Sequence, residues 1–159
     1  MHDYENPMTV NANAPAAPPK PSCVMVKWDG ERRFDGGRKG VPTARVDGNG
    51  VTGQSPPEAL LTALASCAAI DVVDILAKRR TPVAALVIDV TGERVDTVPR
   101  RFKHITLGFR ISGDGIERDQ AARAVELSVT KYCSVRDSLR EDIVVDWTVE
   151  LNGEKQPPK

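Results

Sequence analysis

Cys67 and Cys133 are the residues of this sequence whose type and surroundings best suit chemistry. Cys67 lies within the apolar segment SPPEALLTALASCAAIDVVDIL, and Cys133 lies in LSVTKYCSVRD, at the end of the next predicted helix. A cysteine reacts as its thiolate, so a reactive pair requires nearby positive charge and partial access to solvent. If folding brings the two thiols together, the expected chemistry is thiol-based reduction of an oxidant. Their spacing alone does not establish that they meet.

Both cysteines also suit a purely structural role, because free cysteine is among the residues most often buried. Cys67 falls in the middle of its predicted helix, where the helix dipole does not lower the pKa of a thiol. Its activation is therefore expected to require an external cation. Cys23, in the first predicted strand, is expected to contribute only packing.

The element that must position the first of these thiols is a long helix that begins near Ser55. Ser55 is a favourable N-cap, Pro56 and Pro57 suit the first turn, and Glu58 stands where a capping box requires an acidic residue. Apolar residues then recur at helical spacing, and Pro82 ends the pattern. These apolar residues are Leu60, Leu61, Leu64, Cys67, Ala68, Val72, Ile75 and Leu76.

The rest of the ordered chain is predicted to form strands, one further helix and a short helical turn. Asp29-Gly30 is a favoured hairpin turn between the first two strands. Strands are expected at residues 23–30, 31–37, 43–46, 84–95, 101–112 and 143–151, the second helix at 117–132 and the helical turn at 134–139. The order β-β-β-α-β-β-α-β groups strands and helices, which indicates an α+β fold.

A single domain is expected over residues 22–152, between a disordered tail at 1–21, rich in Pro, Ala and Asn, and a flexible tail at 153–159. Lys and Arg total 22, as do Asp and Glu, and aromatic residues make up 4% of the chain. This composition indicates neither nucleic-acid binding nor attachment to an anionic membrane. No apolar run is long enough to span a membrane, and the N-terminus does not have the pattern of a signal peptide, so a cytoplasmic protein is expected.

The remaining motifs favour structural interpretations. GNGVTG has the glycine spacing of a dinucleotide-binding loop, but it does not lie within a βαβ unit, so an ordinary loop is expected. His2 lies in the predicted tail, and His104 stands alone on a strand. Without CxxC or HxxxH spacing, neither a metal site nor a cofactor is expected.

Three segments in order resemble the OsmC/Ohr family of thiol-dependent peroxidases, and its OsmC-like branch most closely. They are SPPEALLTALASCAAIDVVDILAKRR, VTGERVDTVPRRF and RAVELSVTKYCSV. The resemblance covers roughly residues 24–151. It implies an OsmC-like fold with a long central helix, and an intertwined homodimer with two active sites at the subunit interface.

The resemblance also implies roles for particular residues. Cys67 would be the peroxidatic cysteine, which becomes a sulfenic acid, and Cys133 would resolve that acid to a disulfide. Arg38 in the GGRKG turn would stabilise the thiolate, with Arg33 as the second choice. Glu58 would orient the arginine through a bidentate ion pair.

Two features depart from the pattern of the best-known members of the family. Glu58 stands one residue closer to the first cysteine than their glutamate does, which turns a helical side chain by about 100°. Ser134-Val135 follows the second cysteine, where the most active peroxidases have a proline.

The expected function is reduction of organic hydroperoxides, alkyl or fatty-acid, in oxidative stress defence, with a lipoyl- or thioredoxin-like dithiol as the reductant. The first alternative is a non-enzymatic protein with the same fold that senses oxidants or binds a small ligand. The second alternative is a thiol hydrolase or transferase with Cys67 as nucleophile. It would require a base near Cys67, and neither histidine of the sequence is a convincing one.

Overall fold

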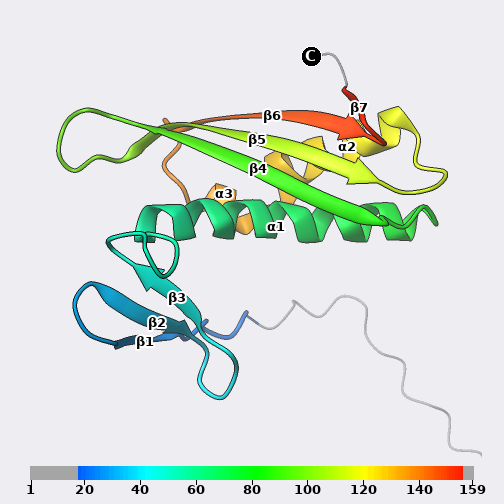
Figure 1. Cartoon of the computed structure of the whole chain (residues 1–159). Coiled ribbons are helices and arrows are strands. Elements are labelled where there is room, and N and C mark those ends of the chain that lie inside the picture. The colour runs from blue at the N-terminus through cyan, green and yellow to red at the C-terminus, as the bar shows by residue number, and fades with distance from the viewer. Residues whose placement is uncertain (1–17, 156–159) are drawn as a thin grey trace, which may run out of the picture.

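The computed structural model describes residues 18–155 and shows a small three-stranded sheet, a larger four-stranded sheet and two main helices (Figure 1). The strands are β1 Met25–Trp28, β2 Arg33–Gly37, β3 Ala44–Asp47, β4 Ala85–Arg94, β5 Phe102–Ser112, β6 Val144–Leu151 and β7 Glu154–Lys155. The helices are α1 Pro56–Lys78, α2 Arg118–Leu127 and α3 Ser134–Asp137, with a π-helix, η1, at Ser128–Tyr132. The fold is the expected α+β class. Of the predicted N-terminal tail, residues 1–17 lie outside the described chain.

The three N-terminal strands form an antiparallel sheet in the order β1-β2-β3. Trp28 pairs with Phe34 across the first hairpin. In its turn, Gly30 and Glu31 have positive φ angles of 81° and 49°. Glycine adopts such angles without the steric cost that a side chain brings, and the turn predicted at Asp29-Gly30 is confirmed.

The glycine-rich segment after β3 is a loop held by a buried aspartate. Asp47 is 2% exposed, and its carboxylate accepts hydrogen bonds from the backbone of Asn49 at 2.8 Å and from the backbone and hydroxyl of Thr52, both at 2.9 Å. A Cβ atom on Gly53 would lie 2.7 Å from the Arg45 carbonyl oxygen. The glycine is therefore explained by close packing against β3, in agreement with the predicted structural loop.

Helix α1 begins as its sequence predicts. The Glu58 Oε2 atom accepts hydrogen bonds from the backbone N–H and the hydroxyl of Ser55, both at 2.7 Å, which closes the predicted capping box. Pro56 and Pro57 occupy the first turn. After Lys78 the chain turns at Arg80, whose φ angle is 64°.

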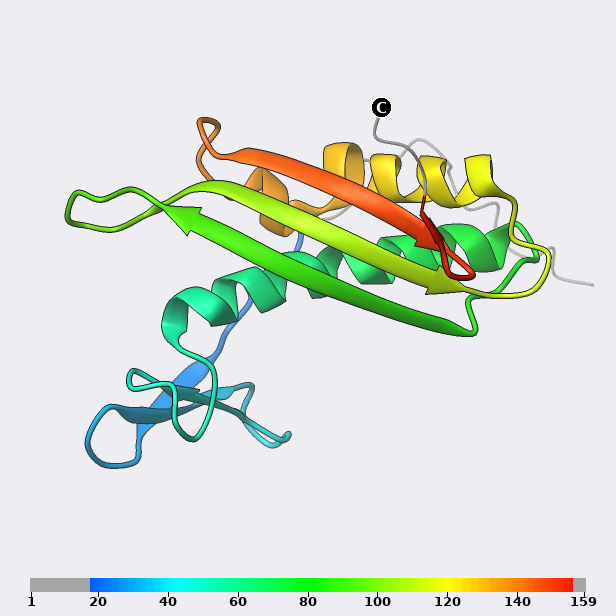
Figure 2. The ribbon, with the colours of Figure 1, turned by 45° about the horizontal axis from the view of Figure 1, so that its top comes forward.

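The larger sheet has the strand order β4-β5-β6-β7. β4 and β5 form a long antiparallel hairpin, whereas β5 and β6 are parallel. A parallel pair requires a crossover connection, commonly a helix, and here α2, η1 and α3 supply it. As a result α1 and α2 lie on the same face of this sheet (Figures 1 and 2).

Two details differ from the prediction, although the second helical segment ends at Tyr132 as expected. The second helix does not run uniformly to Tyr132, because its last turn widens into the π-helix η1, in which the Cys133 N–H donates to the Ser128 carbonyl oxygen at 2.9 Å. The predicted flexible tail at 153–159 is also too long, since β7 pairs with β6 through Glu154 and Lys155. Residues 156–159 lie outside the described chain.

The core fills the space between the larger sheet and the two helices. Alternate residues of β5 point toward the helices, and small alanines let α2 approach α1 closely. The almost fully buried residues include Leu64, Ala68, Val72, Leu76, Ile105, Leu107, Phe109, Ala121, Ala124 and Val125. The core therefore fixes α1, which carries the first cysteine, against the segment that carries the second.

Apolar surface remains exposed in the single chain. The small sheet contacts α1 near its beginning and projects away from the larger sheet (Figures 1 and 2). Trp28 on β1 is 63% exposed, and Ile70 on α1 is also 63% exposed. Although no membrane span is predicted from the sequence, α1 has the length and the mean hydropathy, 2.0, of one. The core helix of a soluble protein can pass the same test. Because only 28% of the apolar window of α1 is buried, this helix leaves apolar surface exposed in the single chain.

Candidate active site

The two predicted cysteines come together between α1 and the short helix α3. Cys67 is half-buried in the middle of α1, and Cys133 is 4% exposed at the end of η1. The Cys133 thiol donates to the Leu64 carbonyl oxygen of α1 at 3.9 Å, and the thiols of Cys133 and Cys67 lie close enough for each to influence the pKa of the other. The sequence could not establish this contact, which requires the crossover to pack on α1.

The π-helix η1 sets the position of Cys133. Ser128, fully buried, donates its hydroxyl proton to the Ala68 carbonyl oxygen of α1 at 2.8 Å. That bond ties η1 to α1 at the residue after Cys67. The chain then turns into α3, where the Arg136 N–H donates to the Cys133 sulfur at 3.4 Å.

The environment of Cys67 favours its thiolate. Burial acts to raise the pKa of this thiol, but hydrogen bonds from the Val135 N–H, the Cys133 thiol and the Ser134 hydroxyl outweigh it and lower the pKa below its ordinary value. The Ser134 Oγ atom lies 3.9 Å from the Cys67 sulfur. Donors within the same chain therefore lower this pKa, contrary to the expectation that only an external cation could do so.

Cys133 has the opposite character. Burial, together with its interaction with Cys67, raises the pKa of the Cys133 thiol to about 11, despite the hydrogen bond from the Arg136 N–H. Cys133 therefore stays protonated at neutral pH while Cys67 ionises more readily. A thiolate beside a thiol, with different access to solvent, is the arrangement that a nucleophile and its resolving partner require.

The two candidate arginines are not at the thiols within this chain. Arg38 is exposed in the turn after β2, and its side chain has no hydrogen-bond or ion-pair partner among residues 18–155. The Arg33 guanidinium pairs instead with Glu31, at 3.1 Å. Arg33 belongs to β2 and Arg38 follows it, and neither is among the principal influences on the pKa of Cys67 or of Cys133 in this chain.

Glu58 also lies away from Cys67. Nine residues of α-helix correspond to about two and a half turns, so the two side chains leave α1 on opposite sides. The pKa of Glu58 is lowered chiefly by its hydrogen bonds to the Ser55 hydroxyl and N–H. In the described chain Glu58 acts as the capping-box partner.

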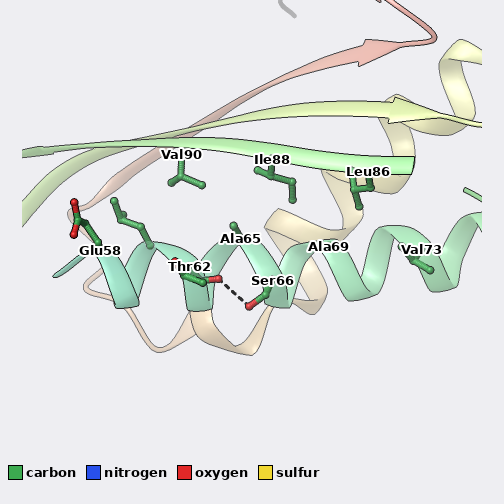
Figure 3. A pocket seen from close by; sticks show the side chains of 10 residues that line it. Glu58, Thr62, Ala65, Ser66, Ala69, Val73, Leu86, Ile88 and Val90 are labelled. Carbon is green, nitrogen blue, oxygen red and sulfur yellow. Dashed lines mark hydrogen bonds between the residues drawn. The ribbon is translucent and has the colours of Figure 1, made fainter. Parts of the chain in front are cut away.

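A groove of about 630 Å³ runs between α1 and the edge strand β4. Figure 3 shows Leu86, Ile88 and Val90 of β4 pointing toward α1, with Glu58 at one end of the groove. The Ser66 hydroxyl, next to Cys67 in the chain, donates to the Thr62 carbonyl oxygen at 2.8 Å. The groove is mostly apolar and suits an alkyl chain or an apolar side chain of a partner.

Two polar residues near the thiols were not predicted from the sequence as residues of the site. Ser134 contacts Cys67 directly, and Asp71, one helical turn beyond Cys67, acts through its charge to raise the pKa of that thiol. Two signals in the sequence could have identified them. Ser134 is the neighbour of Cys133 in the chain, and Asp71 stands four residues after Cys67, on the same face of the helix.

The described residues support neither a metal site nor a catalytic histidine. No group of three metal-binding side chains occurs among residues 18–155. His104 lies on β5 and pairs with Asp146 at 2.9 Å, whereas His2 lies outside the described residues. The thiol hydrolase alternative therefore gains no support, because no described histidine stands beside Cys67.

The fold and the adjacent thiols define an α+β protein with a two-cysteine site between its central helix and a crossover segment. The family model of OsmC-like proteins matches residues 47–148. Protein YhfA of Escherichia coli K12 is 39% identical over 129 residues, which cover 80% of this chain and 96% of that protein. The chain belongs to the OsmC-like protein family, as the sequence motifs predicted.

Solved structures share the fold at lower sequence identity. The OsmC-like protein of Mycoplasma pneumoniae has a TM-score of 0.71 at 16% identity, covering 83% of this chain and 97% of that one. The organic hydroperoxide resistance protein OhrB of Bacillus subtilis has a TM-score of 0.53 at 18% identity, with coverage of 82% and 96%. At these identities the comparison establishes the fold, which includes proteins named for organic hydroperoxide resistance.

Proposed function

We propose that the protein is a homodimeric, cofactor-free thiol peroxidase that reduces organic hydroperoxides in the cytoplasm as part of oxidative stress defence. The observation that supports it most is the pairing of a half-buried Cys67, whose pKa is lowered, with a buried, protonated Cys133. Membership of a fold family that includes organic hydroperoxide resistance proteins supports the choice of oxidant.

The first step is attack of the Cys67 thiolate on the terminal peroxide oxygen. A sulfur–oxygen bond forms, the oxygen–oxygen bond breaks, and the alkoxide leaves and takes up a proton to become the alcohol. Cys67 is then a sulfenic acid. The donors around Cys67, the Val135 N–H and the Ser134 hydroxyl, stabilise the negative sulfur before the attack.

The second step is attack of the Cys133 sulfur on the Cys67 sulfenic acid. A disulfide forms and the hydroxyl of the sulfenic acid leaves as water, taking the Cys133 proton. A dithiol of the lipoyl or thioredoxin type, named here as the co-substrate, then reduces the disulfide by thiolate exchange and is itself oxidised to a disulfide.

Two parts of the proposal remain, which are the choice of peroxide and the assembly into a homodimer. The groove beside α1 is lined by aliphatic side chains such as Leu61, Ile88 and Val90 and by neither cysteine, so the preference for an organic hydroperoxide over hydrogen peroxide rests on the family. The exposed apolar residues of α1 and of the small sheet suit an intertwined homodimer. In such a dimer, Arg38 of one copy would lie near Cys67 of the other.

The experiment is the loss of cumene hydroperoxide with dithiothreitol as reductant, with hydrogen peroxide as the comparison substrate. We expect rapid loss of the organic peroxide that Cys67→Ser abolishes, whereas Cys23→Ser, a change at an exposed thiol, leaves it intact. Cys133→Ser should accumulate a sulfenic acid that dimedone traps. No loss above the dithiothreitol blank would reject the peroxidase and favour the oxidant sensor, and Cys67-independent loss would reject the site.

A further inference from the structure

A second cavity, of about 440 Å³, lies between the crossover segment and β6. Cys133 is one of the residues that line it, and Cys67 is not. The walls come from η1, α3, the loop after α3 and β6, and no residue of α1 contributes to them. We call this cavity the Cys133 pocket. It reaches the second thiol of the site without passing the helix that carries the first.

The Cys133 pocket is built from β6 on one side and α3 on the other. Val145 and Trp147 are half-buried on the side of β6 that faces the helices. Arg136 fixes the opposite wall, because its Nη2 atom donates to the Ile143 carbonyl oxygen at 3.1 Å and its backbone N–H donates to the Cys133 sulfur at 3.4 Å. A cavity of this size, with apolar and polar walls, suits a small molecule.

The oxidation state of Cys133 decides what a molecule in this pocket can do. In the reduced protein, burial raises the pKa of the Cys133 thiol to about 11, so at neutral pH this sulfur is not a nucleophile toward a solute. In a disulfide the same sulfur is an electrophile, which a thiolate attacks without any ionisation of Cys133. The pocket therefore suits the reductive half of the proposed cycle.

The direction of attack also agrees with the position of the pocket. In thiol–disulfide exchange the attacking, attacked and leaving sulfurs lie close to one line, so the nucleophile arrives opposite to the leaving sulfur. Cys67 belongs to α1, and the Cys133 pocket contains no residue of α1. Because its pKa is lowered, the Cys67 thiolate is also the better leaving group of the two.

We propose that a small dithiol reductant enters the Cys133 pocket and attacks the Cys133 sulfur of the disulfide. This rests on the Cys67–Cys133 disulfide of the proposed function. A bond forms between the first reductant sulfur and Cys133, the Cys67–Cys133 bond breaks, and its electron pair leaves with Cys67 as a thiolate. The second thiol of the reductant then attacks the first reductant sulfur. Cys133 leaves with the proton of that thiol, and the reductant ends as a disulfide.

The first test identifies the attacked sulfur. Diamide oxidises the purified protein in place of a peroxide, so that the disulfide is made whether or not the protein is a peroxidase. The monothiol 2-mercaptoethanol is then added, the reaction is stopped early with acid, and peptide mass spectrometry locates the mixed disulfide. We expect the adduct on Cys133, with Cys67 free. An adduct on Cys67 would overturn the proposal, as would a failure of diamide to join the two cysteines.

The second test obstructs the pocket from its rim. Thr130 on η1 and Asp137 on α3 are exposed and line it. Thr130→Trp and Asp137→Trp should each slow reduction of the diamide-formed disulfide by dithiothreitol at least about tenfold, because exchange requires access to the attacked sulfur. Arg123→Trp, at an exposed residue of α2 outside the pocket, is the matched control and should be reduced at the native rate.

A further readout separates obstruction from damage to the fold. Alkylation of Cys67 by iodoacetamide in the reduced protein should proceed equally in the native protein and in both pocket variants, because Cys67 does not line the pocket. Native rates of disulfide reduction in both pocket variants would overturn the proposal. Slowed reduction that is matched by the Arg123→Trp control would overturn it as well.

The two proposals can fail separately. A diamide-formed disulfide that is attacked at Cys133, in a protein that does not consume cumene hydroperoxide, would support the pocket and reject the peroxidase. Conversely, Cys67-dependent peroxide loss with the adduct on Cys67 would support the peroxidase and reject the Cys133 pocket as the entrance for the reductant.

Discussion

The contact between Ser134 and Cys67 gives the nucleophile a hydroxyl donor, which a proline at this position could not provide. Ser134→Ala should therefore raise the pKa of Cys67 and slow its alkylation by iodoacetamide at neutral pH. A hydrogen bond of this kind contributes about 1 kcal/mol, so the expected slowing is roughly fivefold. The measurement is the alkylation rate against pH.

Ser138→Ala is the matched control for that change. The Ser138 hydroxyl donates to the Ser134 carbonyl oxygen at 2.7 Å, so its loss perturbs α3 to a similar degree without removing a donor from Cys67. Equal slowing in the two variants would show that Ser134 acts only through the structure of α3.

The buried thiol of Cys133 makes a second prediction at this scale. Because its pKa is about 11, iodoacetamide should modify Cys67 of the reduced, folded protein at neutral pH and leave Cys133 unmodified. In urea, where burial is lost, both should react. Peptide mass spectrometry distinguishes the two sites, and comparable modification of both in the native state would contradict the assigned roles.

Among the elements, the loop after β3 depends on ionised Asp47. Three backbone N–H groups and the Thr52 hydroxyl lower its pKa from 3.8 to about 2. A folded-state pKa below the unfolded value means that the carboxylate stabilises the fold fully above pH 3.8 and progressively less as the pH falls through about 2. Asp47→Asn should remove this contribution.

The sign of this pH dependence can be checked by urea unfolding of the native protein and of the Asp47→Asn variant over this range of acidic pH. The native protein should be the more stable near neutral pH, and the difference in free energy of unfolding should shrink as the pH falls toward 2. Asp114→Asn, in an exposed turn, should show no such trend. A difference that does not vary with pH would mean that the charge of Asp47 does not hold the loop.

The sequence predicted those elements whose signals are local. Ser55 and Glu58 mark the start of α1, and Asp29-Gly30 marks the first hairpin. The π-turn that positions Cys133 could not be predicted, because it arises from tertiary contacts such as the bond from Ser128 to Ala68. β7 is two residues long and carries no pattern of its own.

The same distinction holds for the candidate site. The motifs identified both cysteines, and their contact follows from the packing of η1 on α1. The roles of Arg38 and Glu58 came from resemblance alone and stay predictions, since the single chain brings neither residue to Cys67. Asp71 was not identified because its spacing of four residues from Cys67 is a weak signal on an amphipathic helix until its side chain is known to lie near the thiol.

At the scale of the whole molecule, the exposed apolar residues favour the proposed homodimer. Ile70, on the helix that carries Cys67, is 63% exposed. Only 28% of the apolar window of this helix is buried. We expect the protein to sediment at twice its chain mass of 17.3 kDa. Ile70→Lys should weaken the dimer at least about a hundredfold, because a lysine charge would be buried against apolar surface.

Val144→Lys supplies the matched control, since Val144 is 55% exposed on the face of the larger sheet that the helices do not cover. It should leave the mass of the dimer unchanged. Sedimentation over a concentration series separates dissociation from unfolding when circular dichroism is recorded on the same samples. A native protein that sediments at the mass of one chain would contradict the dimer. It would also remove the route by which Arg38 of one copy would reach Cys67 of the other, so the assembly measurement constrains the thiol site itself.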